Sequence, residues 1–277
     1  MYNLNNQSKI AILANTKKQS WPLGDYIHIL SFIPNLKFKN LNWYSGRDVF
    51  KIVREIDFID NFKDLKQFKQ NNYDHVINLY EDLPNDKKNF YIKNLFNKNL
   101  NEKQNTKNLL SQLGKVYNVK KHKIFFNRKE KIKCKYDVFI CWNTDDKWKI
   151  KRYPFKNYLR IKEKLEAKYN IKIKIQKKQD SLNRYIQNIK HSKIILSVMT
   201  LGIHLSMVFD KDLVALIGPN NYNDLRLYKK VVQILPNKRC FVHKKKLNIN
   251  YKKCSCMKNI NENKIITAIS KIYEKIS

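Results

Sequence analysis

KIILSVMTLGIHLSMVF, residues 193–209, contains the longest apolar run of the chain. Its first six residues predict a buried strand, and a short helix is expected to begin near Thr200. The run is interrupted by serine, threonine, glycine and histidine, and it is shorter than the apolar stretch that crosses a bilayer. Two buried elements joined by a turn therefore explain it better than a membrane span.

Apolar strands alternate with amphipathic helices on both sides of this stretch. Further strands are predicted at YDVFICW (136–142), at the period-two run IKIKI (171–175) and at LVALIG (213–218). Pro154 suits the first turn of a helix, and Ser181 can cap another through Lys190. A last helix is expected over residues 262–275. The helix after Pro154 is expected to bury an apolar face of Phe155, Tyr158, Leu159, Ile161 and Leu165.

The first half of the chain repeats this pattern. Strands are predicted at KIAILAN (9–15), LNWYS (41–45) and HVINLY (75–80), with helices over 25–33 and from Asp48. The stretch 86–107 is expected to be helix and loop. Strand–helix alternation in two sets predicts an α/β protein with two doubly wound parallel sheets. The basic segment 120–135 is the expected linker, which gives domains at 1–128 and 129–277.

Composition narrows the class of protein. The chain has 277 residues, 43% of them hydrophobic and 12% aromatic, which excludes wholesale disorder. Five cysteines are too few for a disulfide scaffold. The start of the chain lacks the pattern of a signal peptide, so we expect a cytoplasmic protein.

The formal charge of +34 has an ordinary explanation in lysine that is spread over the whole chain. The basic clusters 120–135 and 243–246 do not interleave aromatic residues in an RNA-binding pattern. The sequence therefore argues against specific nucleic-acid recognition. Attraction to an anionic membrane surface or to phosphorylated acceptors remains physically reasonable.

Three places can carry chemistry, each with a plainer alternative. Gly24 and Asp25 lie between the first strand and the first helix, where an ionised carboxylate could take a proton from a hydroxyl. An ordinary capping aspartate is the alternative. Lys151 and Arg152 precede a helix start, and Thr144 follows a strand, so together they could meet a phosphate. Taken alone, they are two basic residues and a loop threonine.

The third place is the turn after the strand that ends near residue 198. Backbone N–H groups there can hold a diphosphate, with Thr200 adding a hydroxyl and Gly202 following it. His204 shares a helix face with Thr200. Contact of this histidine with a ligand and burial in the core are equally compatible with the pattern.

A fourth pattern concerns metal binding. Cys240, His243, Cys254 and Cys256 offer four soft ligands for a tetrahedral site. Their spacing is irregular, and buried or idle thiols are the favoured interpretation.

The order of these motifs resembles glycosyltransferase family 9, the bacterial heptosyltransferases of lipopolysaccharide core assembly. Leu23-Gly24-Asp25 resembles the family's Gly-Asp turn, and Lys151-Arg152-Tyr153-Pro154 resembles its Lys-x-Trp-Pro element. Thr200 with His204-Leu205 resembles its Asp-Thr-Gly-x-x-His-Leu motif. The remaining similarities are Tyr73-Asp74 before a strand, Ser181-Leu182 before a helix, the apolar strand 213–219 that ends in Gly-Pro, and Cys256-Met257-Lys258-Asn259-Ile260.

The resemblance implies a GT-B fold, in which two Rossmann-like domains face a cleft. The first would bind the acceptor and the second the nucleotide-sugar donor. It implies an inverting transfer with Asp25 as general base and with no cofactor required. The donor, ADP-heptose-like by resemblance, would be held by Gly24, Thr144, Lys151, Arg152, Thr200, Gly202 and His204.

The implied acceptor is a lipopolysaccharide-type or other surface glycan, which would place the protein in the cytoplasm or on the cytoplasmic face of the inner membrane. Met199 stands where the family has an acidic residue before the threonine. An alternative is therefore a non-catalytic relative that binds a nucleotide, a glycan or a protein partner.

Overall fold

The computed structural model describes residues 9–14, 40–45, 61–78, 89–91, 132–219, 230–238 and 254–277. The chain divides into two compact units, Met1–Lys129 and Glu130–Ser277. The division falls inside the basic segment 120–135 and one residue after the predicted boundary. The described residues of each unit include one parallel sheet.

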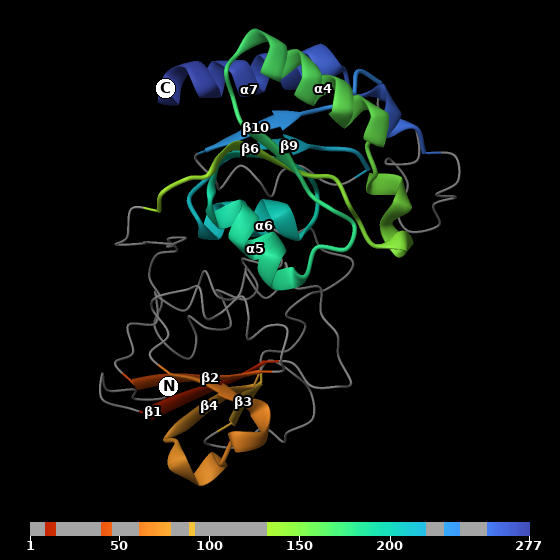
Figure 1. Cartoon of the computed structure of the whole chain (residues 1–277). Helices are drawn as coiled ribbons and strands as arrows, with labels where there is room; N and C mark the ends of the chain where they lie inside the picture. Colours follow the sequence, from red (N-terminus) through yellow and green to blue (C-terminus); the bar gives the residue numbers. More distant parts are fainter. Residues whose placement is uncertain are drawn as a thin grey trace. The chain divides into compact units, whose positions relative to one another are not determined.

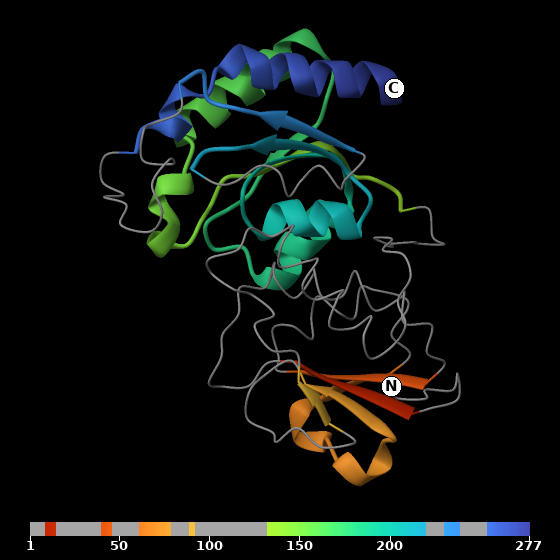
Figure 2. The same cartoon turned by 180° about the vertical axis from the view of Figure 1, so that it is seen from behind.

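The first unit has a five-stranded parallel sheet, seen from behind in Figure 2. Its strand order is β3-β2-β1-β4-β5, so the order reverses between β1 and β4. Two short 3₁₀ turns, η2 (Leu65–Gln67) and η3 (Gln70–Asn72), separate β3 from β4. The strands are β1 (Lys9–Ala14), β2 (Asn40–Ser45), β3 (Asn61–Asp64), β4 (His75–Asn78) and β5 (Asn89–Tyr91).

Three of these strands match predicted ones, and two do not. The strands predicted from KIAILAN, LNWYS and HVINLY are confirmed as β1, β2 and β4. β3 was not predicted. β5 lies inside the stretch 86–107, where we expected helix and loop, so that prediction was wrong at residues 89–91. Both are edge strands of four and three residues, too short to show a period of their own. The predicted helices over 25–33 and from residue 48 lie outside the described residues.

The second unit is a parallel sheet between two layers of helices. Its strand order is β10-β9-β8-β6-β7. In Figure 1, α4 (Phe155–Lys168) and α7 (Glu262–Ile276) cover one face, while α5 (Leu182–Lys190) and α6 (Leu201–Val208) cover the other. The strands are β6 (Tyr136–Cys141), β7 (Ile173–Ile175), β8 (Ser192–Val198), β9 (Asp212–Leu216) and β10 (Val231–Ile234).

The long apolar run of residues 193–209 forms most of β8 and all of α6. Ile194, Ile195 and Leu196 are fully buried because helices cover both faces of the sheet. The α6 helix is itself buried from Gly202 to Val208. None of the helices in the described parts of the chain is long and apolar enough to cross a membrane.

One predicted helix face needs correction. In α4 the residues Tyr158, Ile161 and Leu165 are buried as expected, but Phe155 is 42% exposed and Leu159 is 40% exposed. Leu159 follows Tyr158 directly and so lies about 100° around the helix from it, outside the buried stripe. Phe155 is the first residue of the helix, where it packs beside Trp142 with ring centroids 4.6 Å apart.

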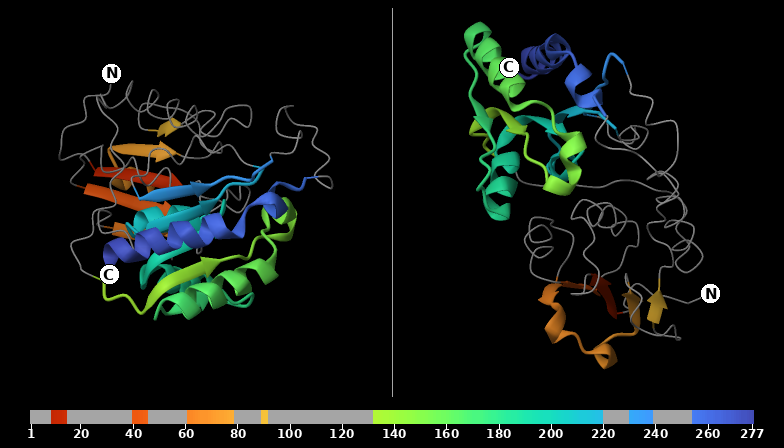
Figure 3. Two further views of the ribbon diagram at one scale, coloured as in Figure 1. Left: turned by 90° about the horizontal axis from the view of Figure 1, so that it is seen from above. Right: turned by 90° about the vertical axis from the view of Figure 1, so that its right-hand side faces the viewer.

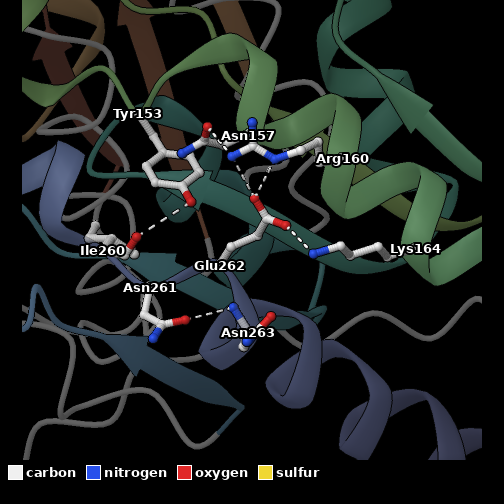
Figure 4. Close-up of polar contacts among 8 residues, drawn as sticks. All are labelled: Tyr153, Asn157, Arg160, Lys164, Ile260, Asn261, Glu262 and Asn263. Atoms are coloured by element: carbon white, nitrogen blue, oxygen red, sulfur yellow. Dashed lines mark hydrogen bonds and ion pairs between the residues drawn. The ribbon is translucent and has the colours of Figure 1, made fainter.

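A charged contact joins α4 to α7. These two helices lie side by side in the left view of Figure 3. Glu262, in the first turn of α7, accepts a hydrogen bond of 2.9 Å from Arg160 Nε and one of 2.8 Å from Lys164 Nζ (Figure 4). Just before α4, Tyr153 Oη donates to the Ile260 carbonyl oxygen at 3.5 Å. The Tyr153 bond holds the chain just before α4, which follows Arg152 by only three residues, and the two bonds of Glu262 hold the middle of that helix.

Candidate nucleotide-binding site

Two loops of the second unit leave the sheet side by side. β6 and β8 are hydrogen-bonded neighbours, and Cys141 pairs in register with Ser197. The chain continues from β6 into the segment with Thr144 and from β8 into Met199 and Thr200. β7 lies on the other side of β6, so the strand order reverses between β6 and β8. In open α/β sheets, ligands bind beyond the carboxyl ends of the strands at such a point.

The predicted residues after β6 interlock with one another. Arg152 Nε donates to Thr144 Oγ1 at 3.0 Å, and Arg152 Nη2 donates to the Thr144 carbonyl oxygen at 2.7 Å. The same guanidinium pairs with Asp146 Oδ1 at 2.8 Å, and this bond is the largest cause of a lowered pKa at Asp146. The arginine thereby fixes the loop between β6 and the 3₁₀ turn η4 (Asp146–Lys151).

Lys151 links the two loops. Its ammonium group donates to the carbonyl oxygen of Met199 at 3.4 Å. The lysine comes from the segment after β6, and Met199 lies in the turn after β8. The structure thus brings the predicted Lys151 and the predicted Thr200 turn to the same edge of the sheet.

The turn after β8 presents the start of α6 to this edge. Thr200 is the N-cap residue, with φ −141° and ψ −173°, and its side chain makes no capping bond. Its hydroxyl instead donates to the Val198 carbonyl oxygen at 3.3 Å and lies 3.5 Å from Ser197 Oγ. The N-terminus of a helix carries partial positive charge, which favours an anion.

Gly202 lies where there is no room for a side chain. A Cβ atom built on it would come 2.6 Å from Tyr185 Oη, 2.7 Å from Ser197 Oγ and 3.1 Å from Cys141 Sγ. The absence of a side chain lets the first turn of α6 approach three polar groups of the sheet layer and of α5. Gly202 therefore has a packing role that its position in the sequence did not reveal.

Met199 and His204 are both buried, each 9% exposed. At position 199 the chain offers the site a backbone carbonyl, bonded to Lys151, in place of a carboxylate. His204 lies one turn after Thr200 on a helix whose other residues are apolar except for Ser206. Burial agrees with both predictions for this histidine, contact with a ligand and a place in the core, so it does not distinguish them.

Other predicted site residues lie wholly or partly outside the described residues. Gly24 and Asp25 follow β1 in the sequence but are not described, and neither are Cys240 and His243. Cys256 is buried and Cys254 is half-buried. Among the residues that the structure describes, no three metal-ligating side chains come together. Because Cys240 and His243 are not described, the choice between a metal site and idle thiols is not tested.

Sequence reasoning missed the buried groups behind the Thr200 turn. These are Cys141 at the end of β6, Tyr185 on α5 and Ser197 near the end of β8. A serine inside the run KIILSV was a weak signal, because a polar residue in a fully buried strand needs a partner. Nothing local in the sequence connects Tyr185 to this place, since α5 precedes β8 and reaches the turn only through packing.

Comparisons with known proteins identify the fold. No protein-family profile and no curated protein matches the chain. Among solved structures, the chain is similar to Escherichia coli ADP-heptose lipopolysaccharide heptosyltransferase II, with a TM-score of 0.64 and 11% identity over 96% of this chain and 99% of that one. It has the GT-B fold of the heptosyltransferases.

Two further structures support this assignment. A family 9 glycosyltransferase from Veillonella parvula DSM 2008 gives a TM-score of 0.64 at 15% identity, with 99% of both chains covered. The iron-containing dodecameric glycosyltransferase TibC from enterotoxigenic E. coli H10407 gives 0.61 at 10% identity, covering 98% of this chain and 78% of TibC. The resemblance to family 9 is thus confirmed as a structural match over nearly the full length. At these identities the likeness establishes the fold, and the chemistry must be argued from residues.

Proposed function

We propose that this protein is a glycosyltransferase whose second unit binds the diphosphate of a nucleotide-sugar donor. The observation that carries the proposal is the meeting of Lys151 with the Met199–Thr200 turn where the strand order reverses. A cation, a hydroxyl and a helix N-terminus at one edge make a site suited to a diphosphate. The full-length likeness to heptosyltransferase structures supports it.

Each donor-binding residue has a role in this proposal. Lys151 and Arg152 supply positive charge, which stabilises the diphosphate as it leaves. Thr144 and Thr200 offer hydroxyl groups, Gly202 allows close approach of the α6 backbone, and His204 lies one turn behind. In the first unit, Gly24 would allow the donor close to the turn that carries Asp25.

The proposed reaction is a direct displacement with inversion at the anomeric carbon. An acceptor hydroxyl oxygen attacks that carbon, a new C–O bond forms, and the bond to the diphosphate breaks. Asp25 takes the proton of the acceptor hydroxyl, and the nucleoside diphosphate carries away the electron pair. A heptosyltransferase of the same fold is named for ADP-heptose, so an ADP-linked heptose is the first donor to offer.

We propose a lipopolysaccharide-type or other surface glycan as the acceptor. Such acceptors are anchored at the membrane, and the formal charge of +34 would draw the protein to an anionic leaflet. The reaction would then take place in the cytoplasm, at the inner face of that membrane.

The replacement at Met199 supports a second candidate, a non-catalytic relative that binds a nucleotide, a glycan or a partner without turnover. The site there holds a buried methionine side chain and not a carboxylate. The two candidates share the nucleotide site and differ in whether any donor is consumed.

Turnover by the wild type separates the catalytic from the non-catalytic candidate, and an Asp25→Asn variant tests the proposed base. We expect the wild type to release nucleoside diphosphate from one nucleotide sugar when a glycan acceptor is present. Asp25→Asn should lower the rate at least about a hundredfold with donor binding intact, because general-base catalysis contributes about that much or more.

A matched control is Asp74→Asn. Asp74 accepts a hydrogen bond of 2.8 Å from the Lys9 backbone N–H at the amino-terminal end of β1, so its loss should leave turnover unchanged. Unchanged turnover in Asp25→Asn would remove this residue from its assigned role. Donor binding without turnover in the wild type would favour the non-catalytic candidate.

A further inference from the structure

A buried polar cluster lies directly behind the first turn of α6. It consists of Cys141 from β6, Ser197 from β8 and Tyr185 from α5, all at most 7% exposed. The hydroxyl oxygens of Tyr185 and Ser197 lie 2.6 and 2.7 Å from the place of a Cβ on Gly202. Three elements of the unit thus direct polar atoms at one backbone position of the proposed diphosphate site.

Tyr185 is the member that reaches this place from outside the sheet. Its ring lies edge-on to Phe139 with centroids 5.9 Å apart, so the aromatic part is held by the core. Its hydroxyl oxygen lies near Ser197 Oγ and Cys141 Sγ, because all three atoms surround the place of a Cβ on Gly202. Burial raises the pKa of this phenol well above its usual value, so the group stays a neutral hydroxyl at any physiological pH.

The cluster lies next to Thr200, on the side of this residue that faces the core. Thr200 Oγ1 lies 3.5 Å from Ser197 Oγ, which in turn lies near Tyr185 Oη at Gly202. The Thr200 side chain makes no bond to the first N–H groups of α6. Its orientation is therefore set by its bond to the Val198 carbonyl oxygen and by the cluster behind it, and not by the helix that it caps.

We propose that Tyr185 is a positioning residue for the diphosphate site, acting through Thr200 and the Gly202 backbone. The inference rests on the proposed function, because it needs Thr200 and the N-terminus of α6 to hold the donor. Tyr185 does not touch the donor in this proposal, since its hydroxyl lies behind the α6 turn. It fixes the hydroxyl and the N–H groups in the geometry that the diphosphate requires, which lowers the cost of ordering them on binding.

A double-mutant cycle on nucleotide affinity tests this role. Dissociation constants are measured by calorimetry for ADP, UDP, GDP and CDP with the wild type, Tyr185→Phe, Thr200→Ala and the double variant. Loss of one oriented hydrogen bond corresponds to about a five- to tenfold change in affinity. We expect Tyr185→Phe to weaken binding of the best nucleotide by about that factor in the wild type, and by a clearly smaller factor in the Thr200→Ala background, where only the Gly202 backbone remains.

Tyr158→Phe is the matched control. It removes one buried phenol hydroxyl from the same unit, on α4, which covers the other face of the sheet. We expect unchanged affinity in this variant. Urea unfolding of each variant separates the effects, because a merely structural role of Tyr185 would lower stability and leave the dissociation constant unchanged.

The outcomes are distinct. Equal affinity in Tyr185→Phe and the wild type would overturn the positioning role and leave the proposed function standing. An equal loss in both backgrounds would also overturn it, because Tyr185 would then act independently of Thr200. A wild type that binds none of the four nucleotides would overturn the proposed function together with this inference.

Discussion

Gly202 is the residue at which packing and proposed function meet. A methyl group there would lie within 3 Å of the buried hydroxyl oxygens of Tyr185 and Ser197, so the α6 turn would have to shift. We expect Gly202→Ala to lower the free energy of unfolding by about 1–3 kcal/mol, as overpacking does. It should also weaken nucleotide binding. Urea unfolding and calorimetry measure the two effects.

Gly218→Ala provides the comparison at the same scale. Its new methyl group would meet the Sδ and Cγ atoms of Met257, and a methionine side chain can rearrange. We therefore expect a smaller loss of stability than in Gly202→Ala. A Gly202→Ala variant as stable as the wild type would show that the turn can relax without cost.

The hydroxyl of Tyr158 offers a substitution that should stabilise the protein. The side chain is fully buried, and no hydrogen-bond partner for its oxygen lies among the described residues. Leaving a polar atom buried and unpaired costs about 1–3 kcal/mol. Tyr158→Phe keeps the ring, so we expect a stability gain of about 1 kcal/mol in urea unfolding. A clear loss would mean that the hydroxyl has a partner in solution.

At the scale of elements, Glu262 holds α7 against α4. Burial raises the pKa of this carboxyl, but the hydrogen bonds and charges of Lys164 and Arg160 outweigh burial, and the pKa lies below its usual value. Both cations are about half exposed, so the contact contributes less than a buried ion pair would. We expect Glu262→Gln to cost about 1 kcal/mol, measured by urea unfolding at pH 7.

The same pKa shift predicts a pH dependence. A carboxyl with a lowered pKa in the folded state stabilises the fold above its unfolded pKa, and this contribution is lost as pH falls through the folded pKa. The stability gap between the wild type and Glu262→Gln should therefore shrink below about pH 4.5. The control is Glu166→Gln. Glu166 pairs with Lys162 on the same helix, so this ion pair does not connect two elements. A gap that is constant with pH would contradict the account.

Local sequence predicted some of the strands and site residues and missed others. β6 and β8 were predictable because long apolar runs mark strands that are buried on both faces. β3, β5 and β10 have three or four residues each, and their hydrogen bonds come from neighbouring strands, so their own residues carry little signal. Thr200 and Gly202 could be chosen from a strand–turn–helix pattern. Tyr185 and Cys141 could not, because only tertiary packing brings them behind that turn.

At the scale of the whole molecule, the formal charge of +34 predicts a second, unspecific kind of binding. Binding to DNA or to anionic vesicles should weaken steeply with salt, because it releases counterions. Lys151→Ala should barely change it, since one lysine among 57 Lys and Arg residues is removed. Affinity for DNA measured at several salt concentrations tests this. Salt-independent DNA binding would indicate a specific nucleic-acid site and contradict the account.

Thermal unfolding of the full chain with a panel of nucleoside diphosphates and nucleotide sugars, at moderate salt, shows directly whether the protein has a diphosphate site. A ligand at a hundred times its dissociation constant adds about 2.7 kcal/mol of stability. We predict selective stabilisation by one nucleotide, its loss in Lys151→Ala, and its retention in Lys168→Ala at the far end of α4. Stabilisation by no nucleotide, or equally by all polyanions in both variants, would contradict a diphosphate site at the β6–β8 edge.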